Sequence, residues 1–132
     1  MYKIFNVLIF FILAISCEVS NNKLLKALPE GKTNIKFSNI VKENDSVNIL
    51  NYEYFYNGAG VAIGDLNNDS LPDIVFSGNQ VDNAIYLNKG DLTFEDVSIE
   101  SKFSKKNKLL WSSGVNIIDI NNDDLLDIYV CN

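Results

Sequence analysis

The feature that most constrains the fold of this chain is an internal repeat. Residues 60–78 align with residues 114–132 at a constant offset of 54 residues, and 10 of the 19 aligned positions are identical. A fixed period of this length is typical of propellers and solenoids, in which each repeat is one supersecondary unit that buries its apolar face against its neighbours. The repeat therefore predicts one of these two architectures.

Four short β-strands are predicted within one period. Residues 60–65 and 73–77 are apolar and β-branched, whereas residues 84–88 and 93–98 alternate between apolar and polar side chains. Clusters of Gly, Asn and Asp separate these segments. Because four strands per period is the content of one propeller blade, we predict an all-β fold, a partial β-propeller of about one and a half four-stranded blades.

A weaker copy of the repeat precedes the first full period. Residues 35–40 are similar to residues 92–97, and each segment lies shortly before the Gly-Val pair that opens the next period. The chain is therefore expected to hold a last strand, one whole blade and the first half of another. A closed ring takes at least about four blades. We thus expect residues 35–132 to be incomplete repeats of a longer product, with assembly of several chains as the alternative.

The N-terminal segment is predicted to be a signal peptide. After one positive charge at Lys3, an apolar run extends from Phe5 to Ile15. This run is too short to span a hydrocarbon core about 30 Å thick, which takes roughly 20 helical residues. A short apolar core behind a positive charge is typical of a secretory signal. We predict a signal helix over residues 1–17 and a tether over residues 18–34.

The end of this segment resembles the bacterial lipobox, in which a cysteine is lipidated and becomes the first mature residue. Residues 14–17 read Ala-Ile-Ser-Cys, so that Ala14 occupies the place where Leu is usual. The resemblance implies that Cys17 carries a lipid and that the protein is exported and anchored to the membrane, at the outer membrane or the cell surface. Such an anchor is stabilised by about 0.8 kcal/mol per buried methylene group. Secretion without an anchor is the alternative.

The composition excludes several kinds of chemistry. The chain has no histidine, which rules out Ser-His-Asp triads, Cys-His dyads and His-ligated zinc sites. Nothing in the sequence resembles a nucleophile with an activating base, so we expect a protein that is not an enzyme. The net charge is -6, and no basic face is evident that could displace the counterions of phosphates. We therefore expect no nucleic-acid partner.

The acidic residues gather in two stretches of nine residues, 65–73 and 119–127, which hold 7 of the 17 Asp and Glu residues. Both stretches read Asp-x-Asn-x-Asp-x-x-x-Asp. Oxygen donors at positions one, three, five and nine, with a backbone carbonyl at position seven, can surround a hard cation. Flexible coordination by about six to eight oxygens favours Ca²⁺ over Mg²⁺. The candidate ligands are Asp65, Asn67, Asp69, the carbonyl of Leu71 and Asp73 in the first loop, and Asp119, Asn121, Asp123, the carbonyl of Leu125 and Asp127 in the second.

Two other interpretations of these loops are weaker. An EF-hand needs a bidentate Glu at position twelve, but Phe76 and Val130 stand there and the flanking residues are strand-like. Simple hairpin turns favour Asn and Asp, but they do not require Asp at the same positions twice. Position six favours glycine because the backbone is left-handed, and here it is Ser70 or Asp124. We expect the first site to be weaker or strained, since Asp tolerates that conformation better than Ser, and we expect Asp124 to face solvent.

The acidic loop and the residues after it resemble the FG-GAP/VCBS repeats of integrin-like β-propellers, especially those of large bacterial surface lipoproteins. The resemblance rests on Gly-Val-Ala-Ile-Gly-Asp-Leu-Asn-Asn-Asp-Ser-Leu-Pro-Asp-Ile-Val at residues 60–75 and on Ile-Tyr-Leu-Asn-Lys-Gly-Asp-Leu-Thr-Phe-Glu-Asp-Val at residues 85–97. It covers residues 35–132. It implies calcium-stabilised blades and a role in adhesion, or in recognition of a protein or glycan ligand outside the cell.

The rival function is that of the propeller portion of a polysaccharide-binding or polysaccharide-degrading enzyme. Tyr52, Tyr54 and Tyr56 alternate along a predicted strand, and with Trp111 they could stack on carbohydrate. Packing between blades is the other use of such aromatic residues.

Overall fold

The structure of the protein is a computed structural model that describes residues 23–103 and 111–132. The predicted signal peptide, with Cys17, lies outside the described residues. Only one short helix is present in the described part, α2 (Glu30–Thr33), and its residues are not buried. Nowhere in this part of the chain is there a helix with the length and apolar character needed to cross a membrane.

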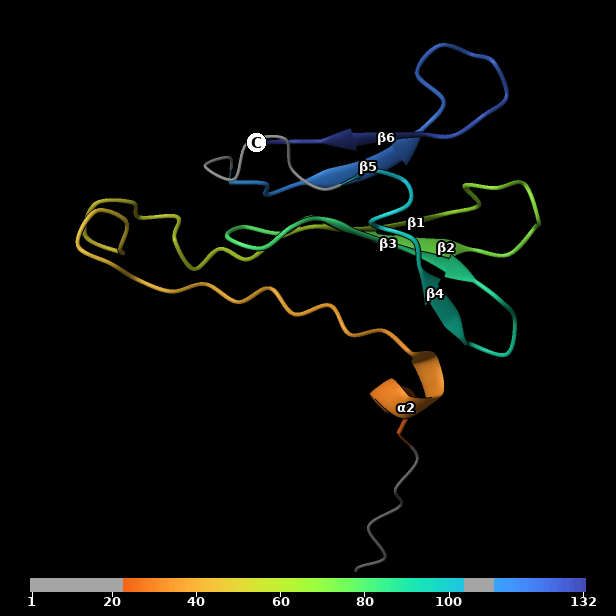
Figure 1. Ribbon diagram of the computed structural model, residues 1–132, viewed down its shortest axis with the longest axis horizontal. Helices are drawn as coiled ribbons and strands as arrows, with labels where there is room; N and C mark the ends of the chain where they lie inside the picture. Colours follow the sequence, from red (N-terminus) through yellow and green to blue (C-terminus); the bar gives the residue numbers. More distant parts are fainter. Residues whose placement is uncertain (1–22, 104–110) are drawn as a thin grey trace, which may run out of the picture.

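The first repeat forms a four-stranded antiparallel sheet in which the strands follow their chain order (Figure 1). The strands are β1 (Val61–Gly64), β2 (Asp73–Phe76), β3 (Ala84–Asn88) and β4 (Phe94–Asp96). All four predicted strands are thus confirmed. The range of β3 coincides with the predicted one, and the other three strands are slightly shorter than predicted.

The second repeat forms a two-stranded antiparallel sheet from β5 (Val115–Ile118) and β6 (Asp127–Val130). Its register repeats that of β1 and β2, because the pairs Val61–Phe76 and Gly64–Asp73 recur 54 residues later as Val115–Val130 and Ile118–Asp127. The sequence repeat is therefore a structural repeat. The described chain is nearly all β, as predicted, and agrees with a partial β-propeller.

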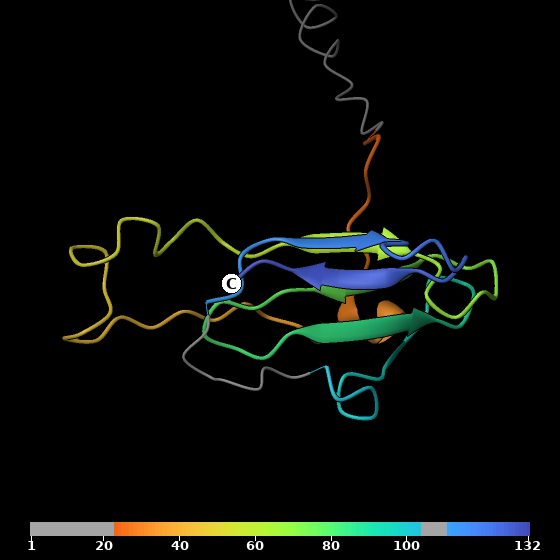
Figure 2. The ribbon, with the colours of Figure 1, turned by 90° about the horizontal axis from the view of Figure 1, so that it is seen from above.

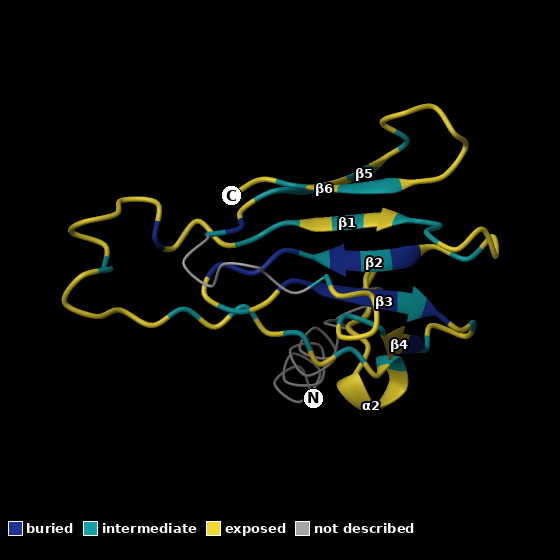
Figure 3. Ribbon diagram, turned by 45° about the horizontal axis from the view of Figure 1, so that its top comes forward, coloured by how far each residue is buried: buried dark blue, intermediate teal, exposed yellow. Residues whose placement is uncertain are grey.

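The two sheets stack through their first strands, β1 and β5 (Figure 1). The buried strand residues lie mainly on β2 and β3 (Figure 3). Two glycines permit the close approach. A Cβ added at Gly60 would lie 2.8 Å from the backbone nitrogen of Val115, and one at Gly64 would lie 2.9 Å from Cγ2 of Ile117. Neighbouring sheets that repeat one strand pattern agree with consecutive blades of a propeller.

The apolar core of the first blade is completed by the N-terminal segment. Ile35 and Phe37 pack against buried residues of β3 and β4. Phe37 stacks on Phe76 with ring centroids 4.7 Å apart and ring planes 8° apart. The backbone nitrogen of Lys36 donates a hydrogen bond to the hydroxyl of Tyr86 at 3.3 Å. The segment therefore covers one face of the sheet.

The predicted last strand over residues 35–40 forms no β-ladder in the structure. A strand requires a neighbouring strand edge to pair its N–H and C=O groups. Here the backbone instead lies across the face of the blade, where the nitrogen of Lys36 donates to the hydroxyl of Tyr86. The prediction of a strand at residues 35–40 is therefore wrong, and these residues contribute side chains to the core instead.

The loops gather at the two opposite ends of the strands (Figures 1 and 2). The acidic loops follow β1 and β5 at one end, and residues 41–58 lie at the other. The strand expected around Tyr52 to Tyr56 is replaced by turns, in which the nitrogens of Phe55 and Asn57 donate to the carbonyls of Tyr52 and Tyr54 at 3.0 and 3.1 Å. Upstream Asn side chains bond the local backbone, which competes with strand formation.

Candidate metal centre

The two acidic loops occupy equivalent places in the two sheets. The first connects β1 to β2 and the second connects β5 to β6, so that both emerge at the same end of the strands (Figure 2). Each loop begins directly after its first strand, and its ninth residue, Asp73 or Asp127, is the first residue of the next strand. The β-hairpin therefore fixes both ends of the loop.

The aspartate at position one curls each loop around its carboxylate. Asp65 accepts hydrogen bonds from the backbone nitrogens of Asp69 at 3.1 Å and Ser70 at 2.7 Å. Asp119 makes the equivalent pair with Asp123 at 3.2 Å and Asp124 at 2.9 Å. Two charge-assisted bonds of this kind hold the middle of the loop over its first residue.

The residues at positions three and five form a second shared network. Oδ1 of Asn67 accepts from the nitrogen of Asp69 at 3.1 Å, and Nδ2 of Asn67 donates to Oδ2 of Asp69 at 3.0 Å. Oδ1 of Asp69 accepts from the nitrogen of Leu71 at 2.8 Å. Asn121 and Asp123 repeat these bonds at 3.1, 2.9 and 2.9 Å. The two loops thus share one side-chain and backbone arrangement.

The aspartate at position nine differs between the loops. Asp73 is fully buried and accepts from the nitrogens of Leu66 at 2.9 Å and Asn88 at 2.8 Å. It therefore ties the loop to both β2 and β3. Asp127 is partly exposed and accepts from the nitrogen of Ile120 at 3.1 Å.

Sequence reasoning missed the role of Asn88. Its amide Nδ2 donates to the carbonyl of Pro72 at 2.9 Å, and its Oδ1 accepts from the nitrogen of Gly90 at 2.9 Å. Asn88 is buried and lies beside Asp73. The Asn-x-Gly spacing of Asn88 and Gly90 is the sequence signal that could have indicated it, because an Asn side chain commonly accepts from the backbone two residues on.

The backbone at position six is left-handed in both loops, as predicted. Ser70 has φ of 67° and Asp124 has φ of 65°. Asp124 is exposed, as predicted. The sequence prediction missed a second left-handed position, because Asn68 and Asn122 at position four both have φ of 59°. Asn accepts this conformation more readily than most residues.

The position-seven residues place their side chains differently. Leu71 is partly buried, whereas Leu125 is 54% exposed. The first sheet has β3 and β4 beyond β2, while β6 has no third strand beside it in the described residues.

The donors of each loop suit a hard cation. They are carboxylate, amide and carbonyl oxygens, and a carboxylate that accepts one N–H bond on each oxygen still has acceptor capacity. Across residues 23–103 and 111–132, however, no three acidic or cysteine side chains are gathered closely enough to form a preassembled metal cluster. The carboxylates of Asp65 and Asp119 accept from backbone N–H groups instead.

Two stacked antiparallel sheets, each with the same acidic loop after its first strand, define a repeat protein of the β-propeller class. A family model described as an FG-GAP-like repeat matches residues 65–130, which is half of the chain. The chain belongs to the FG-GAP-like repeat family. No curated protein and no solved structure matched it.

Proposed function

We propose that this chain is a calcium-binding module of an extracellular β-propeller, which recognises a ligand outside the cell and has no catalytic role. The FG-GAP-like repeat supports an extracellular propeller-like module. The single observation that carries the calcium proposal is the shared bonding network of the two acidic loops, with left-handed residues at the same two positions. Hairpin turns alone would not need this network twice.

The side chains that would hold Ca²⁺ are those at positions one, three, five and nine, with the carbonyl at position seven. In the first loop these are Asp65, Asn67, Asp69, Asp73 and Leu71, and in the second they are Asp119, Asn121, Asp123, Asp127 and Leu125. Three carboxylates in one short loop repel each other, and backbone N–H groups offset only part of that repulsion. A divalent cation would offset the remainder, which couples cation binding to the folding of the loop.

Export and membrane attachment through a lipid on Cys17 are part of the same proposal. They are supported by the apolar segment and the lipobox resemblance at residues 14–17. The non-enzymatic role is supported by the tie between the loop carboxylates and the backbone, since groups engaged in holding a loop are poorly placed to transfer protons to a substrate. The proposed partner is a protein or glycan ligand, not a nucleic acid.

Calorimetric titration and thermal unfolding test the calcium proposal. We expect the whole protein to bind Ca²⁺ with a Kd of roughly 10⁻⁴ to 10⁻³ M, the range of extracellular modules. The melting temperature is expected to rise with calcium. Asp69→Ala and Asp123→Ala should each remove part of that rise, because each removes a carboxylate from one of the two sites.

Asp124→Asn is the matched control, since it removes a charge from the same loop at an exposed position that supplies no proposed ligand. It is expected to keep most of the calcium response. A protein that takes up no calcium at millimolar concentration, with an unchanged melting temperature, would contradict the proposal. Hydrolysis of glycans that is lost on replacing a carboxylate outside the loops would contradict the non-enzymatic role.

A further inference from the structure

Residues 43–57 form a long segment at the end of the strands opposite to the acidic loops (Figures 1 and 2). Hydrogen bonds from its own side chains to its backbone stabilise the conformation of this segment. Oδ1 of Asn44 accepts from the nitrogen of Val47 at 2.8 Å, and Oδ1 of Asn48 accepts from the nitrogen of Leu50 at 3.0 Å. A segment ordered in advance loses less conformational entropy when it binds a ligand.

An aromatic cluster joins this segment to the start of the second blade. Phe55 is fully buried, and its ring centroid lies 4.9 Å from that of Tyr56 and 5.2 Å from that of Trp111. The Trp111 ring in turn lies 5.4 Å from that of Tyr52. Tyr54 and Tyr56 are nevertheless 54% and 62% exposed in the described structure. The cluster is thus packed around the buried ring of Phe55, while the rings of Tyr54 and Tyr56 remain exposed to solvent.

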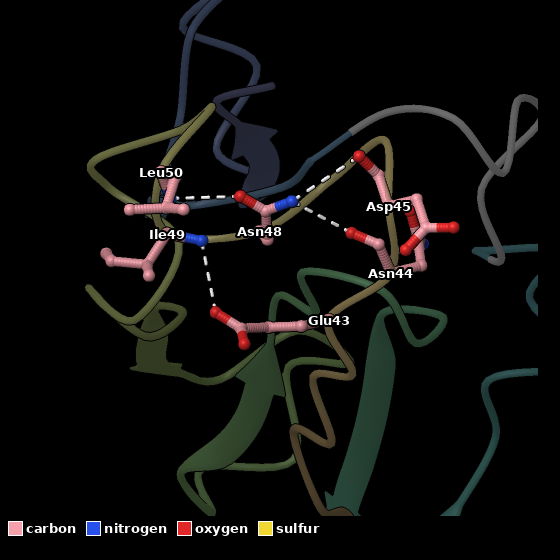
Figure 4. A pocket seen from close by; sticks show the side chains of 6 residues that line it. All are labelled: Glu43, Asn44, Asp45, Asn48, Ile49 and Leu50. Atoms are coloured by element: carbon pink, nitrogen blue, oxygen red, sulfur yellow. Dashed lines mark hydrogen bonds between the residues drawn. The ribbon is translucent and has the colours of Figure 1, made fainter.

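A hollow of about 520 Å³ lies in the same segment (Figure 4). Its volume falls within the range of roughly 300–1,000 Å³ that is usual for small-ligand sites. Its lining residue Asn48 is bonded to the aromatic cluster, because the nitrogen of Tyr52 donates to the carbonyl of Asn48 at 2.9 Å. The lining residues are Glu43, Asn44, Asp45, Asn48, Ile49 and Leu50.

The chemistry of these two neighbouring features favours an uncharged glycan. Exposed tyrosine rings offer flat apolar surfaces with a polar edge, which match the C–H face and the hydroxyls of a pyranose ring. The side chains of Glu43, Asn44 and Asn48 bond the local backbone, and the carboxylate of Asp45 offers an acceptor for a further hydroxyl. The lining includes two acids and no basic residue, and the chain has a net charge of -6. An anionic ligand would therefore be repelled.

We propose that the aromatic cluster (Tyr52, Tyr54, Tyr56 and Trp111) and the adjoining hollow bind an uncharged glycan. The hollow takes one sugar ring, and the tyrosine rings support the next. This inference rests on the proposed recognition function and names the ligand class for it. It requires no contribution from the acidic loops, which lie at the far end of the strands.

An array of neutral hexose and N-acetylhexosamine oligosaccharides tests the inference, with the whole protein in calcium-containing buffer. The strongest glycan is then titrated by calorimetry. We expect Tyr54→Ala and Asp45→Ala each to weaken binding about three- to tenfold, since loss of one exposed aromatic contact or one hydrogen bond has an effect of this order. Tyr129→Ala is the matched control, because Tyr129 is 57% exposed and lies on β6. It should leave the affinity unchanged.

Several outcomes would overturn the inference: no glycan bound by a protein that responds to calcium, binding of anionic glycans alone, or binding that neither Tyr54→Ala nor Asp45→Ala weakens. A protein partner that needs Tyr54, with no glycan bound, overturns it as well. The melting temperature with and without calcium separates the two proposals. A calcium response without glycan binding leaves the metal proposal standing, and glycan binding without a calcium response leaves the glycan inference standing.

Discussion

At the scale of single residues, Asp73 shows how one side chain can serve both a loop and a sheet. Its buried carboxylate accepts from the nitrogens of Leu66 and Asn88, so it fixes the start of the acidic loop and the end of β3. A buried carboxylate with two such donors is a structural group even before any cation binds. Its counterpart Asp127 has a single described donor and is partly exposed.

This difference predicts unequal effects of the same substitution. Asp73→Ala should lower the free energy of unfolding by about 2–5 kcal/mol in calcium-free buffer, because it leaves two backbone N–H groups without their acceptor. Asp127→Ala should lower it by about 1–2 kcal/mol, since one partly exposed donor is affected. Urea unfolding of both variants measures the difference. Equal losses in the two variants would show that the Asn88 contact contributes nothing.

Ser70 illustrates a residue whose conformation the loop imposes. A φ of 67° costs a non-glycine residue roughly 1–2 kcal/mol. Asp124 takes nearly the same conformation in the second loop, where its short polar side chain tolerates it better. The centre of the first loop is therefore more strained than that of the second.

At the scale of elements, the contact between β1 and β5 depends on the absence of side chains. Gly60→Ala would place a Cβ 2.8 Å from the nitrogen of Val115 and 2.9 Å from the carbonyl oxygen of Ser113. Both are backbone atoms, which cannot rotate away. We expect a loss of about 1–3 kcal/mol in the free energy of unfolding, the usual cost of overpacking.

Gly31→Ala is the control for this prediction. A Cβ at Gly31 would meet no atom within 4 Å, and Gly31 lies in α2, where alanine is favoured over glycine. Urea unfolding should show an unchanged or slightly raised stability for Gly31→Ala. Comparable losses at the two positions would mean that the close approach of the blades is not what Gly60 provides.

The strands and the acidic loops could be predicted from sequence because both depend on local patterns. Alternation and β-branched residues located β3 at its observed bounds, and the spacing of Asp65, Asn67 and Asp69 located the first loop. Contacts distant in sequence could not be predicted in this way. The bond from Asn88 to Asp73 spans a hairpin, and the packing of residues 35–40 on a sheet face, in place of a ladder, depends on which strand edges are available.

At the scale of the whole molecule, the N-terminal segment and the first blade are linked through Tyr86. Tyr86 is 1% exposed, and its hydroxyl accepts from the nitrogen of Lys36. Burial raises the pKa of Tyr86, the hydrogen bond from Lys36 opposes part of the rise, and the nearby carboxylate of Asp96 adds to it. The hydroxyl of Tyr86 therefore loses its proton at a higher pH in the folded protein than in the unfolded chain.

This shift predicts alkaline sensitivity. A raised folded-state pKa gives stability that is complete below the unfolded value, about 10, and that is lost as the pH rises through the folded value. Urea unfolding between about pH 8 and 11 should show a falling stability, and Tyr86→Phe should make that fall shallower. At neutral pH the variant should be about 0.5–1.5 kcal/mol less stable, because Lys36 loses its acceptor. Identical slopes in the two proteins would contradict the role of Tyr86.

The glycines between the two sheets also bear on how the repeat has diverged. The 54-residue offset pairs Gly60 with Gly114, but it pairs Gly64 with Ile118. The second copy thus carries a half-exposed isoleucine where the first carries a glycine packed against Ile117. The two copies are therefore not interchangeable. Exchanging one for the other would place an isoleucine at the position of Gly64, where an added Cβ would already lie 2.9 Å from Cγ2 of Ile117.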